Sequence, residues 1–179
     1  MKARGFTLIE LLVVIAIIGL LASIVLASLT SARAKARDAT RIAALDQLRT
    51  ALEFYASDHN GSYPSTSGGW WGICSDAGSH ALTGSNGYIP NLAPTYIPTL
   101  PVDPKTGGAA CSSSPTNSYS YNSNGTDYMI LAYVMDETYT TAASNPEPRP
   151  LVNGSATPCG TNNGYEKDFA MYSAGGTCY

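Results

Sequence analysis

One ionisable side chain, Glu10, lies at the edge of a long apolar run, and it is the first residue whose type and position suggest chemistry. The run from Leu11 to Leu29 contains no charged residue and no proline. A charge inside a membrane helix costs about 2.5 to 3.5 kcal/mol at the bilayer centre and usually marks function. Near the start of the helix the carboxylate could instead reach interfacial water, which is the structural alternative. We favour a functional role for Glu10.

The cysteines are the second group with chemical potential. They are widely separated and form no Cys-x-x-Cys pair: Cys74, Cys111, Cys159 and Cys178. Such spacing does not favour a zinc or redox centre. We expect two disulfides instead, and these need an oxidising compartment such as the periplasm or the cell exterior.

No catalytic constellation accompanies these residues. The two histidines have no partner at metal or triad spacing, and the sequence contains no nucleophile elbow, zinc-protease motif or phosphate loop. We therefore predict a protein that is not an enzyme, with no catalytic residues, no metal site and no cofactor.

Charge also argues against nucleic acid as a partner. The chain has 10 Lys and Arg against 13 Asp and Glu, a formal net charge of −3. Phosphate binding needs cations clustered on one face. Arg33, Lys35, Arg37 and Arg41 do follow the apolar run closely, but we interpret them as contacts to lipid headgroups or neighbouring subunits.

The apolar run predicts a membrane helix. Its 19 residues span about 28 Å as a helix, close to the thickness of the bilayer hydrocarbon. The run is too long for the apolar region of an ordinary cleaved signal peptide. We place the transmembrane segment at about residues 8–29.

Helical periodicity continues beyond the membrane segment. One stripe of mostly apolar residues recurs at spacings of three and four: Ala39, Ile42, Leu45, Leu48, Leu52 and Tyr55. Asn60-Gly61 and then Pro64 signal the end of the helix. These patterns predict one nearly continuous helix over residues 6–58, with Gly19 as its weak point because the membrane segment lacks proline.

The remaining residues, 59–179, predict a globular head. Residues 62–117 are punctuated by Gly and Pro and indicate a long ordered loop. From residue 118 the period changes to two, Asn124-Gly125 predicts a hairpin turn, and residues 169–172 predict a further short strand. We expect an α+β fold in which the long helix packs on a small antiparallel sheet within 118–179.

The N-terminal sequence resembles the processing site of the type IV pilin and type II secretion pseudopilin family. A short basic leader with Lys2 and Arg4 precedes the motif Gly5-Phe6-Thr7-Leu8-Ile9-Glu10, and the apolar run follows it. The resemblance implies that prepilin peptidase removes residues 1–5 by cutting between Gly5 and Phe6, and that the new Phe6 amine is methylated. It also implies that Glu10 neutralises the Phe6 amine of a neighbouring subunit during assembly.

The same resemblance implies a pilin-like structural subunit that associates with itself into a helical filament. Its further partners would be the peptidase and methyltransferase, the assembly platform of a pilus or secretion system, and the membrane. Three disulfide connectivities are possible for four cysteines. We expect Cys74–Cys111 and Cys159–Cys178, because both pairings are sequential and the second would close a C-terminal loop, as in many pilins. Major pseudopilins hold calcium in C-terminal loops, but we do not transfer that site, since the Asn124-Gly125 turn explains its candidate residues.

Two alternatives stay open: a membrane-tethered, non-polymerising binding module outside the cytoplasm, and a pilin for DNA uptake. Glu10 favours a filament over the first alternative. Lys and Arg are denser after the apolar run than before it, which by itself predicts a cytoplasmic head. The cysteines and the processing motif oppose that orientation. We expect a single-pass cytoplasmic membrane protein with its head outside, which then enters a pilus or pseudopilus.

Overall fold

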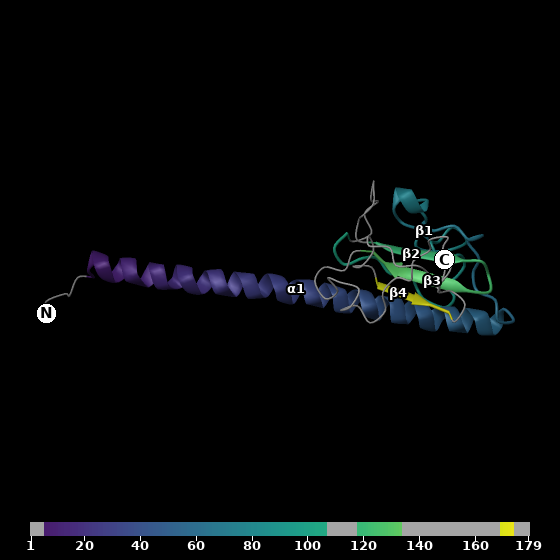
Figure 1. The fold of residues 1–179 in the computed structure, drawn as a ribbon, viewed down its shortest axis with the longest axis horizontal. Helices are drawn as coiled ribbons and strands as arrows, with labels where there is room; N and C mark the ends of the chain where they lie inside the picture. The colour runs from purple at the N-terminus through teal and green to yellow at the C-terminus, as the bar shows by residue number, and fades with distance from the viewer. Residues whose placement is uncertain (1–5, 107–117, 134–168, 174–179) are drawn as a thin grey trace, which may run out of the picture.

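The computed structural model describes residues 6–106, 118–133 and 169–173 (Figure 1). In chain order, the elements are helix α1 (Leu8–Asp58), strand β1 (Trp71–Gly72), the short 3-10 helix η1 (Ser75–Ala77), and strands β2 (Tyr119–Ser123), β3 (Tyr128–Ala132) and β4 (Phe169–Tyr172). The N-terminal half of α1 projects away from the head, and its C-terminal half lies along the sheet. This arrangement confirms the predicted α+β fold.

Helix α1 runs unbroken for 51 residues and passes through Gly19 without a break. It begins at Leu8, two residues later than predicted, because Thr7 takes the extended conformation of an N-cap residue (φ −83°, ψ 149°). At the other end, Asn60 and Gly61 adopt positive φ, and the Gly61 N–H donates to the Ala56 carbonyl at 2.8 Å. The predicted stop signal is therefore confirmed.

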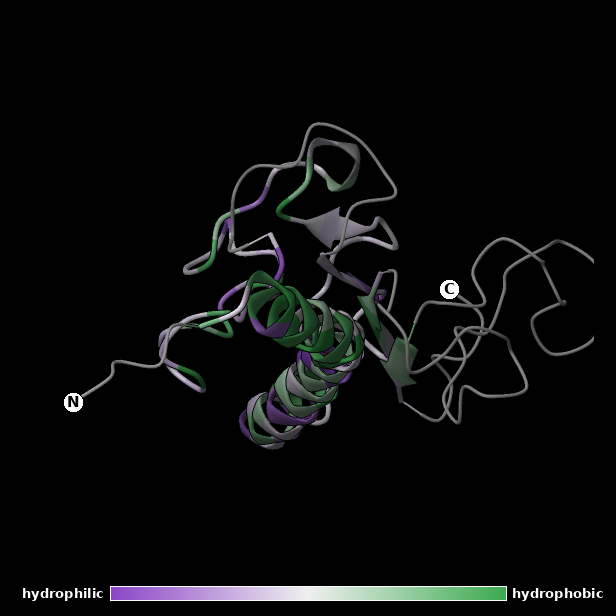
Figure 2. Cartoon of the chain, turned by 90° about the vertical axis from the view of Figure 1, so that its left-hand side faces the viewer, coloured by the Kyte–Doolittle hydropathy of each residue, from purple (hydrophilic) through white to green (hydrophobic). Residues whose placement is uncertain are grey.

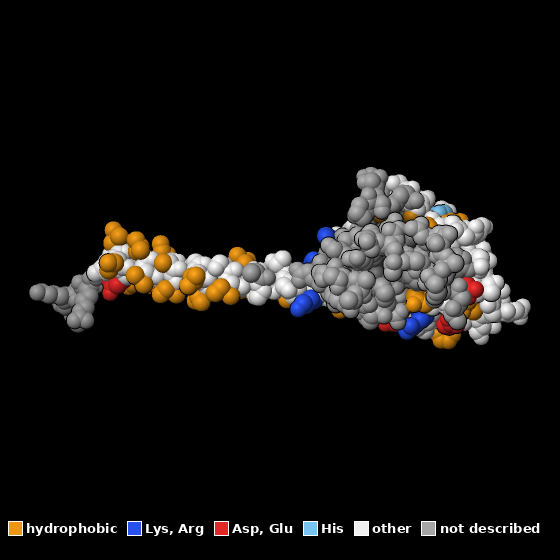
Figure 3. All heavy atoms as spheres, in the orientation of Figure 1, with side chains coloured by type: hydrophobic (Ala, Val, Ile, Leu, Met, Phe, Trp, Pro, Cys, Tyr) orange, Lys and Arg blue, Asp and Glu red, His pale blue; other side chains and the backbone are white. Residues whose placement is uncertain are grey.

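The projecting half of α1 is apolar on all sides. Its large apolar side chains from Leu8 to Leu29 are between 41% and 81% exposed (Figure 3). Figure 2 shows the same half in hydrophobic colouring, which becomes mixed where the helix meets the head. By length and composition this is a helix able to cross a membrane, with a mean hydropathy of 2.9 over its most apolar window.

The C-terminal half of α1 supplies one wall of the hydrophobic core. Leu45, Leu48 and Leu52 are fully buried against residues of the loop and the sheet, including Ile89 and Ile130. These three leucines, together with the partly buried Ile42 and Tyr55 that pack against the same cluster, confirm most of the predicted stripe. Ala39 was assigned to it wrongly, because it is exposed.

The buried face turns to polar residues near Ala39, which explains the error. Asp38 and Arg41 occupy the buried positions there, and both are fully buried. A search for apolar periodicity cannot find a face that is continued by charged residues.

The sheet is antiparallel, with the strand order β1-β2-β3-β4. The predicted hairpin is confirmed as β2 and β3, in which Tyr121 pairs with Ile130, and the predicted strand at 169–172 is confirmed as β4. Strand β1 was missed because two residues carry no detectable period, so the sheet extends into the segment predicted as loop.

Both faces of β2 and β3 are buried, contrary to the alternation of apolar and polar residues expected from the sequence. Tyr119 and Tyr121 belong to the core cluster that includes the leucines of α1. Ser120 and Asn122, which alternate with them, are also buried. A second small cluster, formed by Met129, Leu131 and Ala170 with the partly buried Trp70, Tyr133 and Tyr172, includes residues of β3 and β4. In β2 the polar residues therefore do not mark a solvent-exposed face, which is what a period-two pattern is usually taken to indicate.

Candidate functional site

Glu10 is held at the first turn of α1 by a capping box with Thr7. The Thr7 backbone N–H and hydroxyl donate to Glu10 Oε2 at 2.9 and 2.7 Å, and the Glu10 N–H donates to Thr7 Oγ1 at 3.3 Å. This reciprocal pair satisfies helix N–H groups that lack internal partners and places negative charge at the positive end of the helix dipole. The carboxylate is therefore fixed in position and exposed.

The spacing Thr-x-x-Glu before an apolar run is a sequence signature of this cap. Sequence reasoning used Glu10 alone and missed Thr7, although the signal was present. Phe6 directly precedes Thr7 and is 75% exposed. Gly5 lies outside the described residues, so the predicted cleavage site is not placed by the structure.

Cys74 is buried in the head and is disulfide-bonded. The other three cysteines, Cys111, Cys159 and Cys178, lie outside the described residues, so the partner of Cys74 is not identified. The pairing expected from the sequence stays a prediction.

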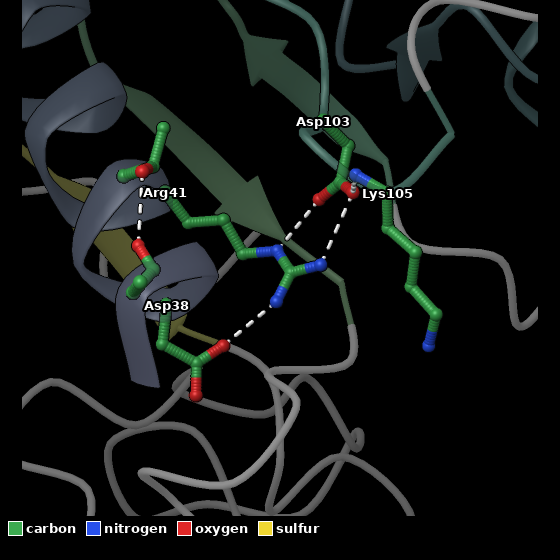
Figure 4. Close-up of polar contacts among 6 residues, drawn as sticks. Asp38, Arg41, Asp103 and Lys105 are labelled. Carbon is green, nitrogen blue, oxygen red and sulfur yellow. Dashed lines mark hydrogen bonds and ion pairs between the residues drawn. The ribbon is translucent and has the colours of Figure 1, made fainter. Parts of the chain in front are cut away.

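A buried ionic cluster joins α1 to the loop that precedes β2 (Figure 4). Arg41 donates from Nε and Nη2 to the two carboxylate oxygens of Asp103 at 2.7 and 3.1 Å, and from Nη1 to Asp38 Oδ1 at 2.7 Å. All three residues are fully buried. The Lys105 backbone N–H adds a bond to Asp103 Oδ1 at 2.8 Å.

Arg41 was interpreted from the sequence as a contact for lipid headgroups or another subunit, and that interpretation is wrong. A guanidinium forms a two-point contact with a carboxylate, and such a pair tolerates burial because each charge is compensated. The spacing of Asp38 and Arg41 by three residues could have suggested their pairing. Asp103 lies 62 residues away from Arg41, and no local pattern reveals it.

A second polar contact, partly exposed to solvent, lies near the end of α1. Glu53 accepts hydrogen bonds from the hydroxyls of Tyr63 at 3.2 Å and Tyr128 at 3.5 Å. Burial raises the pKa of Tyr128, and the negative charge of Glu53 raises it further. One turn earlier, Asp46 and Arg49 form the ion pair that their spacing predicts, at 2.7 Å.

The hairpin turn accounts for the residues considered for calcium. Asn124 Oδ1 accepts the backbone N–H groups of Thr126 and Asp127, both at 2.9 Å, as an Asx turn does. Across residues 6–106, 118–133 and 169–173, no group of three or more His, Cys, Asp or Glu side chains is placed to hold a metal ion.

Residues 1–26 match a family model described as the prokaryotic N-terminal methylation motif. The type II secretion system core protein G of Escherichia coli K12 is 38% identical over 108 residues, covering 58% of this chain and 67% of that protein. The Klebsiella pneumoniae core protein G is 38% identical over 105 residues, covering 58% and 69%. This chain belongs to the pilin and pseudopilin family.

A pilus protein is also similar to this pilin-like chain. The type IV wide pilus major component PilA4 of Thermus thermophilus is 48% identical over 64 residues, which covers 36% of this chain and 48% of that protein. No solved structure matches the chain.

Membership in the family confirms the predicted function and the prediction that the chain is not an enzyme. The protein is a structural subunit of a type II secretion pseudopilus or a type IV pilus. Its long apolar helix is the part of such a subunit that is suited to the membrane.

Proposed function

We propose that this pseudopilin is cut after Gly5 and that its mature subunits polymerise into the pseudopilus of a secretion system. The core protein G relatives from Escherichia coli and Klebsiella pneumoniae align over 108 and 105 residues, whereas the Thermus thermophilus pilus component aligns over 64. The longer alignments include more than the common N-terminal helix. They favour the secretion filament over a surface pilus, which is the second candidate.

The observation that carries the proposal is the exposed apolar half of α1 with an anchored carboxylate at its start. The large apolar side chains of this half, from Leu8 to Leu29, are 41% to 81% exposed. Their exposure to water would carry a large unfavourable free energy. Lipid covers them before assembly, and other copies of the helix cover them in the filament.

Within the filament, Glu10 pairs with the Phe6 amine of a neighbouring subunit. Cleavage after Gly5 creates that amine directly before the Thr7 cap, at the same end of the helix as the Glu10 carboxylate. A charge moved into a low-dielectric helix bundle needs a partner of opposite sign. The capping box holds Glu10 in one geometry before the partner arrives, which lowers the entropy cost of pairing.

The proposal includes two further partners and an orientation. Prepilin peptidase and its methyltransferase activity act on residues 5 and 6, and an assembly platform in the membrane extracts the processed subunit. The head lies outside the cytoplasm, where an oxidising environment supports the disulfide at Cys74.

Electron microscopy of cells that overexpress the chain tests this function. Fibres that bind antibody against the head are expected, and they should disappear when prepilin peptidase is deleted. The subunit in those fibres should have the mass of a chain that lacks residues 1–5 and carries one methyl group. Processed subunits that stay dispersed in the membrane would instead support the tethered, non-polymerising module.

A further inference from the structure

Helix α1 carries exposed cations directly after its apolar run. Arg33 and Lys35 are exposed to solvent, whereas Arg41 is fully buried in the ionic cluster. Lys35 is turned by about 200° from Arg33, because each residue turns the helix by about 100°. Figure 3 accordingly shows basic side chains on both sides of the helix where it meets the head. Arg33 and Lys35 are called the basic collar below.

The basic collar lies at the depth of the lipid headgroups when residues 8–29 span the membrane. Arg33 and Lys35 follow Leu29 by four and six residues, which corresponds to about 6 and 9 Å along the helix. The headgroup layer extends about 5 to 8 Å beyond the hydrocarbon on each side. Side chains on a helix lean toward its N-terminus, which is the membrane side here, so both cations can reach back into that layer.

Helix α1 supplies no acidic partner at this depth. Between Leu11 and Leu45 its one acidic residue is Asp38, which is fully buried and paired with Arg41. The next acidic residue of α1, Asp46, lies 11 residues beyond Lys35 and pairs with Arg49 at 2.7 Å. The positive charge of the collar is therefore not balanced by any exposed carboxylate of the helix near it.

The sequence left two partners open for these cations, lipid and a neighbouring subunit. Before assembly the apolar run holds every copy at the same depth in the bilayer, so neighbouring copies present their collars at the same level and the like charges repel. Anionic phospholipids place negative phosphate groups at that level and attract Lys and Arg beside a membrane helix. The depth of the collar therefore favours lipid.

We propose that the basic collar binds the phosphate groups of anionic phospholipids in the leaflet on the side of the head. This inference rests on the proposed function only for the placement of α1 across the membrane, and it concerns the subunit before it enters a fibre. It gives the excess of cations after the apolar run a role other than setting the orientation of the chain. An acidic surface of another subunit and soluble phosphate are the alternative partners.

Native mass spectrometry of the full chain tests the inference. The chain is held in a mild detergent with equal amounts of phosphatidylglycerol and phosphatidylcholine that carry the same acyl chains, and the bound lipids are counted. The measured quantity is the ratio of bound phosphatidylglycerol to bound phosphatidylcholine, which should be well above one. Lys2 and Arg4 are the same in every variant, so a difference between variants reports on the substituted position.

Neutral variants of the collar should lose this preference. A cation near an anionic membrane surface contributes about 1 kcal/mol, or about fivefold in affinity. Arg33→Gln and Lys35→Gln should therefore each lower the ratio about fivefold, and the double variant about 25-fold. The double variant Arg33→Lys with Lys35→Arg keeps both charges and should keep the parental ratio. Both positions are exposed, so thermal unfolding of the head should be unchanged.

The matched control is Arg49→Gln, which removes an exposed cation 20 residues beyond Leu29. That distance is about 30 Å along the helix, well outside the headgroup layer, so the ratio should stay at the parental value. Raising the salt concentration from about 50 to about 500 mM should lower the parental ratio, because salt screens exposed charges. Replacing chloride by inorganic phosphate at constant ionic strength should leave the ratio unchanged.

The outcomes separate the lipid contact from its alternatives and from the proposed function. An equal ratio in the parental chain and the double Gln variant, or an equal fall with Arg49→Gln, would overturn the lipid contact. Displacement of the lipid by inorganic phosphate would overturn it in favour of a site for soluble phosphate. Normal fibres from the parental chain would leave the proposed function intact in each case. A chain that forms no fibres but shows the expected ratios would overturn the proposed function and keep the lipid contact.

Discussion

Asp103→Asn should destabilise the head strongly, because Asp103 is fully buried and paired with Arg41. The substitution keeps the shape of the side chain but removes the negative charge that Arg41 contacts through two hydrogen bonds at 2.7 and 3.1 Å. Arg41 then keeps one carboxylate, Asp38, at 2.7 Å. Breaking a buried pair in this way typically costs about 3 to 5 kcal/mol. Asp38 still balances the single positive charge of Arg41, so we expect the smaller loss of charge-assisted hydrogen bonds to Asp103, about 1.5 to 3 kcal/mol.

The assay is urea unfolding of the full chain in detergent micelles, followed by the fluorescence of Trp70 and Trp71 in the head. The matched control is Arg49→Gln, which removes an ion pair of the same 2.7 Å length whose side chains are about half exposed. An exposed pair contributes about 0 to 1 kcal/mol, so the control should change the free energy of unfolding little.

A second variant distinguishes a lost pair from a change in shape. Replacing all three members, Asp38→Leu, Arg41→Met and Asp103→Leu, removes every buried charge at once and should recover much of the stability lost in Asp103→Asn. The reasoning would be refuted if Asp103→Asn cost no more than Arg49→Gln.

Three further predictions concern the precursor, the disulfide and the tyrosines. Gly5→Val should leave an unprocessed precursor, because a branched side chain blocks the peptidase cleft. Glu10→Val should be processed but should lower fibre yield by at least about tenfold, because the Phe6 amine loses its charge partner. Mass spectrometry checks the processing and microscopy checks the fibres, and normal fibres from Glu10→Val would contradict the role of Glu10. Non-reducing peptide mapping should link Cys74 to Cys111, in a loop whose closure contributes roughly 3 to 4 kcal/mol in the chain-entropy model, and a different partner for Cys74 would exclude that pairing. Burial raises the pKa of Tyr128 above its ordinary value, so the folded head holds the hydroxyl proton more tightly than the unfolded chain does. The resulting stabilisation of the folded state is complete below about pH 10 and is lost as the pH rises further toward the folded pKa. Absorbance near 295 nm should accordingly show tyrosine ionisation coupled to unfolding, and ionisation at an ordinary pKa in the folded protein would contradict it.

The elements with strong local signals could be predicted from the sequence. The apolar run and the stop at Asn60-Gly61 defined α1, and the Asn124-Gly125 turn with its flanking strands defined the hairpin. Each of these signals is local, because the residues that determine the structure are neighbours along the chain or along one helix face.

The features that were missed depend on distant residues or on very short segments. Arg41 is buried because Asp103 reaches it from a loop far along the chain, so its basic character alone suggested a surface role. Strand β1 exists through its pairing with β2, since Trp71 opposite Tyr121 is a tertiary contact rather than a pattern. Thr7 is different, because its capping signature was visible beside Glu10 and needed only to be read as a pair.

A cryo-EM reconstruction of the purified fibres tests the central claim most directly. The account predicts a central bundle of α1 helices, with residues 11–29 buried among other copies and the Glu10 carboxylate within hydrogen-bond distance of the Phe6 amine of a different subunit. A map in which the apolar runs lie on the fibre surface, or in which Glu10 faces no amine of another subunit, would contradict it.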